Sequence, residues 1–144
     1  MTIASILATK GNKVVTIRPE HSIRDALRVL ADHNIGALVA IDPSRRPVGI
    51  LSERDVVRAA VRDEAVFGLT VSQLMTRDVI VGAPGDDLAA VGQTMIQRRI
   101  RHLPVVEGGK LIGMVSIGDV VKAQRDHFQG EVDTLQTIVM EQGH

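Results

Sequence analysis

The chain has 144 residues, which is enough for one compact domain or for two small halves that depend on each other. Its formal net charge is zero and its only aromatic residues are two Phe, so it lacks the basic surface and the stacking platforms that nucleic-acid-binding proteins use. It has no Cys, which excludes disulfides and thiolate zinc sites. We therefore expect an aliphatic core, no metal site and no nucleic-acid partner.

The N-terminal segment 1–13 has neither the basic start nor the long apolar stretch of a signal peptide. No apolar run along the chain approaches the roughly 18 residues of a membrane span. We therefore expect a cytoplasmic protein that has no membrane partner.

In chain order, the first half predicts a strand, a helix, two strands and a second helix. Residues 14–17 form a β-rich run. Ser22 is a good N-cap, and the apolar residues after it recur at the three- and four-residue spacing of a helix face. Residues 37–41 and 48–51 predict two strands joined by a turn with Pro at both ends. The second helix begins at Ser52.

The second half predicts the same order of elements. Residues 79–81 form the short first strand, and a helix follows with its apolar face at Leu88, Val91, Met95 and Ile96. Residues 103–106 and 111–115 predict the paired strands, and the last helix of the unit begins at Ser116.

Three segments lie outside these units. Residues 63–75 link the units and predict a short helix near 71–75, and the start of the chain, TIASIL, resembles that helix in its pattern. Near the C-terminus, Val132, Leu135, Ile138 and Val139 fall on one helical face. This apolar stripe could pack back on the core or bind a second subunit.

The two halves are copies of one unit. GILSERDVVRA (49–59) returns 64 residues later as GMVSIGDVVKA (113–123), and 14–39 aligns without gaps on 79–104. A unit of about 50 residues is too small to be stable alone. We therefore predict an α/β (α+β) fold of two β-α-β-β-α repeats packed sheet to sheet about a pseudo-twofold, with domains at 1–63 and 64–127 and a helical tail at 128–144.

The repeated phrase places Ser-x-x-Asp where a strand meets a helix. Ser52 with Asp55, and Ser116 with Asp119, have the spacing of capping boxes, with Asp in place of the usual Glu. A strand-to-helix junction of this kind also suits an anion, and an Asp carboxylate suits a pair of donors such as a ribose diol. The capping and binding interpretations are compatible.

GILSERD and GMVSIGD follow the pattern G-h-x-[ST]-x-x-D, where h is an apolar residue, and RRIRHLPVV precedes the second copy. With the doubled unit, these motifs resemble a tandem pair of CBS domains, also called a Bateman module, over roughly residues 3–125. The resemblance implies that adenosine nucleotides bind in clefts between the repeats. It implies that the Asp holds the ribose hydroxyls and that the Ser meets ribose or phosphate.

Carried onto this sequence, the resemblance implies two composite clefts. One joins Ser52, Arg54 and Asp55 to Arg101 and His102 of the other repeat. The second joins the other Ser-x-x-Asp to a strand entrance and one arginine: Ser116, Asp119, Arg18, Gly36, Ala37 and Leu38.

The same carry-over predicts that the two clefts differ in charge. The cleft of Asp55 would collect the arginines and prefer more phosphate charge than the cleft of Asp119. Alternatives remain for single residues: Arg101 and His102 could be solvated residues before a strand, and Gly36 could only terminate a helix.

The resemblance predicts a stand-alone regulatory module that senses adenosine nucleotides, with AMP as the first choice and ADP, ATP or NAD as alternatives. It requires no cofactor, forms a homodimer and signals to an unknown regulated protein by a conformational change. The alternative is a structural interaction module whose clefts are vestigial. We predict no enzyme activity, because the five His show no metal-ligand spacing and Met114 stands where a G-x-S-x-G nucleophile elbow needs Gly.

Overall fold

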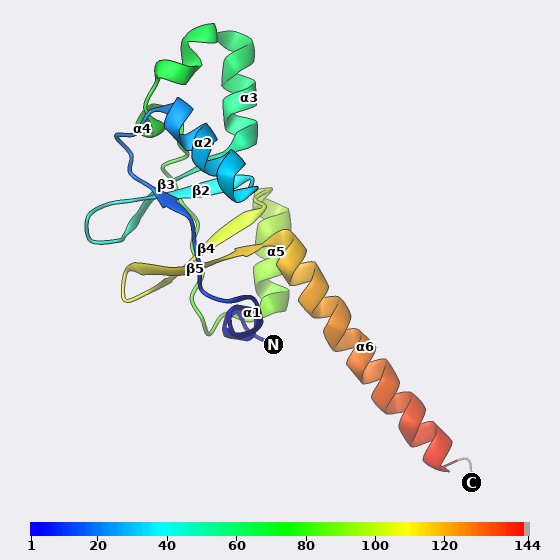
Figure 1. Cartoon of the computed structure of the whole chain (residues 1–144). Coiled ribbons are helices and arrows are strands. Elements are labelled where there is room, and N and C mark those ends of the chain that lie inside the picture. The colour runs from blue at the N-terminus through cyan, green and yellow to red at the C-terminus, as the bar shows by residue number, and fades with distance from the viewer. Residues whose placement is uncertain (143–144) are drawn as a thin grey trace.

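The computed structural model describes residues 1–142. Its elements are, in chain order, α1 (Ile3–Lys10), β1 (Thr16–Ile17), α2 (Ile23–His33), β2 (Ala37–Ile41), β3 (Pro47–Ser52), α3 (Glu53–Arg62), the 3-10 helix η1 (Glu64–Gly68), α4 (Val71–Leu74), α5 (Leu88–Arg98), β4 (His102–Glu107), β5 (Lys110–Ser116) and α6 (Ile117–Gln142). Figure 1 shows the first repeat, with α2 and α3, above the second, with α5 and the start of α6.

The prediction of two β-α-β-β-α repeats is confirmed, with one difference in the first strand. In the first repeat β1 pairs in parallel with β2, and β2 pairs antiparallel with β3. In the second repeat β4 and β5 pair antiparallel, but residues 79–81 form no strand, contrary to the prediction. A single parallel bridge between Gly82 and Val105 stands in its place. Gly is a weak strand former, which explains why the pairing extends no further.

The first helix of each repeat begins and ends in the same way. The Ser22 hydroxyl accepts a hydrogen bond from the Asp25 N–H at 3.0 Å, and the Asp87 carboxylate caps α5 at the matching place. Both helices end at a residue in the left-handed conformation, Asn34 with φ 51° and Arg99 with φ 55°. Asn34 therefore terminates α2, so the alternative role of Gly36 as helix terminator is wrong.

Two short helices outside the β-α-β-β-α units cover the repeats, α4 on the first repeat and α1 on the second. α4 follows the first repeat and packs on it, where the Val71 N–H donates to the His21 carbonyl at 2.8 Å. α1 precedes the first repeat in sequence but packs on the second, where the Ile3 N–H donates to the Asp86 carbonyl at 3.0 Å. The sequence pattern that the two segments share thus reflects the equivalent way in which they pack. Figure 1 shows α1 beside the second repeat.

A glycine in each repeated phrase admits one of these helices. A Cβ on Gly49 would lie 2.2 Å from the Met75 sulfur, just after α4, and a Cβ on Gly113 would lie 2.9 Å from Leu7 Cδ2 in α1. Real Cβ atoms do not approach neighbours this closely. The glycines of GILSERD and GMVSIGD therefore let Met75 and Leu7 pack directly against the strand backbone.

The two sheets meet through a small apolar cluster. Val39 and Ile41 of β2 and Leu111 of β5 are buried together. Beside them Arg45 and Leu111 exchange two hydrogen bonds, one from the Leu111 N–H to the Arg45 carbonyl and one from Arg45 Nε to the Leu111 carbonyl, both 3.0 Å. These contacts hold the repeats sheet to sheet.

α6 is one continuous helix that passes through Gly130 without a break. The last helix of the second repeat and the predicted tail helix are therefore a single element. Figure 1 shows α6 extending away from both sheets, so its apolar stripe does not pack back on the core. Within residues 1–142, no helix is both long and apolar enough to cross a membrane.

Gly113→Ala should destabilise the protein by about 1–3 kcal/mol, because the added methyl group overpacks the contact with Leu7. Gly130→Ala is the matched control, since nothing lies within 4 Å of a Cβ there and alanine favours helix. Urea unfolding measures both free energies. Equal stability of Gly113→Ala and the parent would contradict the close approach of α1.

Candidate functional site

The first Ser-x-x-Asp forms a complete capping box at the junction of β3 and α3. The Ser52 hydroxyl accepts from the Asp55 N–H at 3.2 Å, and the Ser52 N–H donates to Asp55 Oδ2 at 3.0 Å. Both side chains are half-buried. The capping box therefore holds the Asp55 carboxylate in place where β3 meets α3. It occupies only one of the two carboxylate oxygens.

The second junction, between β5 and α6, repeats this geometry. The Ser116 hydroxyl accepts from the Asp119 N–H at 3.0 Å, and the Ser116 N–H donates to Asp119 Oδ2 at 2.9 Å. The capping interpretation is confirmed at both places. The carboxylates of Asp55 and Asp119 are thus held by the same hydrogen bonds at their two strand-to-helix junctions.

Each junction lies beside the strand entrance of its own repeat. Ala37 is the strand partner of Ser52, and the Glu53 N–H donates to the Gly36 carbonyl at 3.0 Å. His102 is likewise the strand partner of Ser116. The expected grouping of each Ser-x-x-Asp with the entrance of the opposite repeat, in a composite cleft, stays a prediction. Pairing of β2 with β3, and of β4 with β5, dictates these contacts.

The nearest neighbours of the two junctions differ in charge. Arg101 and His102 lie at the Asp119 junction, where the Arg101 carbonyl accepts from the Ile117 N–H at 2.9 Å. At the Asp55 junction, the exposed Arg54 stands beside the acidic Glu53. The Asp119 junction therefore gathers more positive charge.

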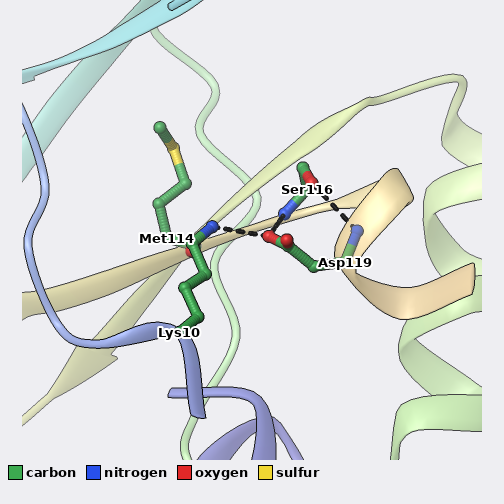
Figure 2. Close-up of polar contacts among 4 residues, drawn as sticks. All are labelled: Lys10, Met114, Ser116 and Asp119. Carbon is green, nitrogen blue, oxygen red and sulfur yellow. Dashed lines mark hydrogen bonds and ion pairs between the residues drawn. The ribbon is translucent and has the colours of Figure 1, made fainter. Parts of the chain in front are cut away.

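Lys10 adds a further cation to the Asp119 junction. Its ammonium donates to Asp119 Oδ2 at 2.5 Å and to the Met114 carbonyl at 2.9 Å (Figure 2). The sequence reasoning missed Lys10, which lies 109 positions from Asp119. The one local signal is Gly11, whose φ of 97° ends α1 directly after Lys10.

These contacts shift the pKa of Asp119. Burial alone raises the pKa of its carboxyl, but hydrogen bonds from Lys10 and from Ser116 outweigh burial, so the net pKa lies below the ordinary value. The carboxylate is thus charged at neutral pH. Its stabilising contribution is complete above the ordinary Asp pKa of about 3.9 and is lost as the pH falls below it.

His102 is held neutral. Burial lowers the pKa of its imidazole, and the positive charges of Lys10 and Arg101 lower it further, while Asp119 and Glu53 oppose the shift. The influence of Glu53 shows that His102 also senses the first repeat. A neutral imidazole offers one donor and one acceptor to a ligand.

The remaining predicted residues divide into two groups. Ala37 and Leu38 are buried in β2. Arg18 lines a pocket of about 490 Å³ with residues of β1 and α2, including His21, Asp25 and Arg28, and the lining of that pocket includes neither junction. The proposed partnership of Arg18 with Asp119 stays a prediction. Among residues 1–142, no group of three or more His, Asp or Glu could hold a metal.

His102 should titrate with a pKa below the ordinary imidazole value of about 6.5, because the folded protein disfavours its charged form. The folded state should consequently lose stability relative to the unfolded state as the pH falls below about 6.5. NMR titration of the imidazole carbons measures the pKa of His102 against the ordinary value of about 6.5. A His102 pKa at or above that value would contradict the assigned burial and charge.

A family model and three solved structures match this chain. The family model of the CBS domain matches residues 4–62 and 71–126. The crystal structure of the CBS-domain protein ATU1752 of Agrobacterium tumefaciens is 38% identical, with a TM-score of 0.82 over 86% of this chain and 99% of that chain. The CBS domain pair of MJ0100, solved with 5′-methylthioadenosine and S-adenosyl-L-methionine, is 26% identical with a TM-score of 0.76 over 91% and 98% of the two chains. The hexameric CBS-CP12 protein of bloom-forming cyanobacteria is 27% identical with a TM-score of 0.73 over 84% and 69%. This chain belongs to the CBS domain family and carries two CBS domains in tandem.

Proposed function

We propose that this chain is a stand-alone regulatory module that binds adenosine nucleotides, with AMP as the first choice, at its two Ser-x-x-Asp junctions. The observation that carries the proposal is the pair of matched capping boxes, which hold one carboxylate where β3 meets α3 and another where β5 meets α6. A CBS pair of the same fold, MJ0100, was solved with two ligands that both contain adenosine. The adenosine moiety is the part that these two ligands share.

The chemistry of the junction suits a ribose diol. At Asp55, Oδ2 accepts the Ser52 N–H, and within residues 1–142 Oδ1 accepts no hydrogen bond. A carboxylate has acceptor sites for about four hydrogen bonds and no donor, so it can take both ribose hydroxyls in addition to the cap.

The expectation that the ligand carries a phosphate rests on the cations at the Asp119 junction. Lys10 and Arg101 are both partly or fully exposed there, and both can donate to a phosphate. ADP, ATP and NAD share the adenosine part and remain the alternative ligands. A titration series with these four nucleotides and adenosine separates them.

The proposed output is a conformational change read by a partner. Ligand contacts at the junctions would bias the packing of one repeat on the other, and the regulated protein would sense that packing. The absence of enzyme activity, of a required cofactor and of a membrane partner stays part of this proposal, as does the cytoplasmic location. The second candidate function, a structural interaction module with vestigial clefts, predicts no thermal stabilisation by any nucleotide.

Asp55→Ala and Asp119→Ala should each weaken AMP binding at their own junction about tenfold to hundredfold. Each loses charge-assisted hydrogen bonds worth about 1.5–3 kcal/mol. Calorimetric titration measures the affinities and the number of sites.

Asp87→Ala is the matched control for this pair. It also removes a helix-capping carboxylate, here from α5, and so costs comparable stability without touching a junction. AMP binding by the double variant Asp55→Ala/Asp119→Ala at parental affinity would sink the proposal.

We also propose that α6 joins two copies of the chain. Exposed apolar residues follow the alternating spacing of a coiled-coil seam along α6: Val121, Phe128, Val132, Leu135 and Val139. A second α6 with the same seam is the surface that this pattern fits. The hexameric CBS-CP12 neighbour shows that a CBS pair of this fold can take part in a larger assembly.

Leu135→Asp should convert the proposed dimer to monomer, because it places a charge in the seam where the side chain is 61% exposed in the single chain. Thr137→Asp adds the same charge off the seam and should leave the dimer intact. Sedimentation at micromolar concentration distinguishes the two masses. A monomer for the parent, with and without AMP, would rule out this dimer.

A further inference from the structure

The two junctions share their capping geometry but differ in one partner. The distance from the Ser N–H to Asp Oδ2 is 3.0 Å at Asp55 and 2.9 Å at Asp119. Of the two aspartates, only Asp119 forms a side-chain ion pair in the described part of the chain, and its partner is Lys10 (Figure 2). This lysine comes from outside both repeats, on helix α1.

The difference arises from the lengths of the two covering helices. α1 continues beyond Leu7, its contact with Gly113, to Lys10. α4 ends at Leu74, and the following segment pairs with β3, where Thr76 and Ile50 exchange backbone hydrogen bonds of 2.9 and 3.0 Å. The segment after α4 therefore runs along the strand, whereas the end of α1 presents a lysine to the junction.

Lys10 and a ribose would compete for the same carboxylate. Asp119 Oδ2 already accepts from both the Ser116 N–H and the Lys10 ammonium. Because both acceptor sites of Oδ2 are taken, a ribose diol that places one hydroxyl on each carboxylate oxygen has to displace the ammonium from Asp119. The lysine can move, because its side chain is 37% exposed on a flexible stem.

The cost of that displacement depends on the charge of the ligand. An uncharged nucleoside separates the ion pair and leaves the ammonium with only the Met114 carbonyl. A ligand with a phosphate provides a new anionic acceptor for the same ammonium. His102 is neutral and Arg101 is exposed at this junction, so Lys10 is the cation whose existing ion pair the ribose disrupts.

We infer that Lys10 makes the Asp119 junction selective for nucleosides that carry an anionic group, by pairing with Asp119 in the empty site and with the phosphate in the occupied one. This inference rests on the proposed nucleotide binding. It assigns the selectivity to a residue of the N-terminal helix.

The test is calorimetric titration of AMP and adenosine in an Asp55→Ala background, where only the Asp119 junction is intact. Lys10→Ala should weaken AMP binding about tenfold, as expected for one charged hydrogen bond, while adenosine binds equally well or more tightly. The ratio of AMP to adenosine affinity should therefore fall at least tenfold. Lys10→Arg should keep the ratio near that of the parent.

Lys13→Ala is the matched control, since it removes the same charge from the exposed segment just after α1 and should leave both affinities unchanged. Equal tightening of both ligands by Lys10→Ala would show that Lys10 only blocks the site, and unchanged affinities would show that it does not act on the ligand; either result overturns the inference. If the Asp55→Ala protein and the parent bind neither ligand, the proposed function fails as well.

Discussion

The structure depends on covering two small sheets that a single repeat cannot cover. The sheets meet each other through Val39, Ile41 and Leu111, and α4 and α1 close the remaining surface. Because α1 crosses to the second repeat, the chain wraps around its own pseudo-twofold. The glycine that begins each repeated phrase favours this arrangement, since it leaves room for Met75 or Leu7. The same crossing brings Lys10 to Asp119.

The residues that start the helices are also the residues proposed to hold the ligand. Asp55 and Asp119 accept the hydrogen bond that closes a capping box, so their positions are set by folding alone. A carboxylate that is already fixed loses little conformational freedom when it binds a diol. Because the same Asp is proposed to serve both folding and binding, the motif G-h-x-S-x-x-D can occur in both repeats although the two sites differ in charge.

The repeats, the helix starts and both capping boxes could be predicted from sequence, because apolar periodicity and capping are local patterns. The nearest neighbours of each junction could not be predicted, because they depend on which strands pair, as His102 pairs with Ser116 of its own repeat. Lys10 was missed since its partner is far away in sequence and α1 packs on the distant repeat. The continuity of α6 through Gly130 was also missed, because glycine is unfavourable in a helix only by about 1 kcal/mol and the surrounding residues favour one.

The central claim is that the two Ser-x-x-Asp junctions hold the ribose of an adenosine nucleotide. A crystal structure of the full chain grown with AMP tests it most directly. The account predicts ribose hydroxyls on the carboxylates of Asp119 and Asp55, with the Lys10 ammonium on the phosphate rather than on Asp119. AMP bound elsewhere, such as in the pocket lined by Arg18 and Arg28, with the Lys10–Asp119 pair intact, would contradict it.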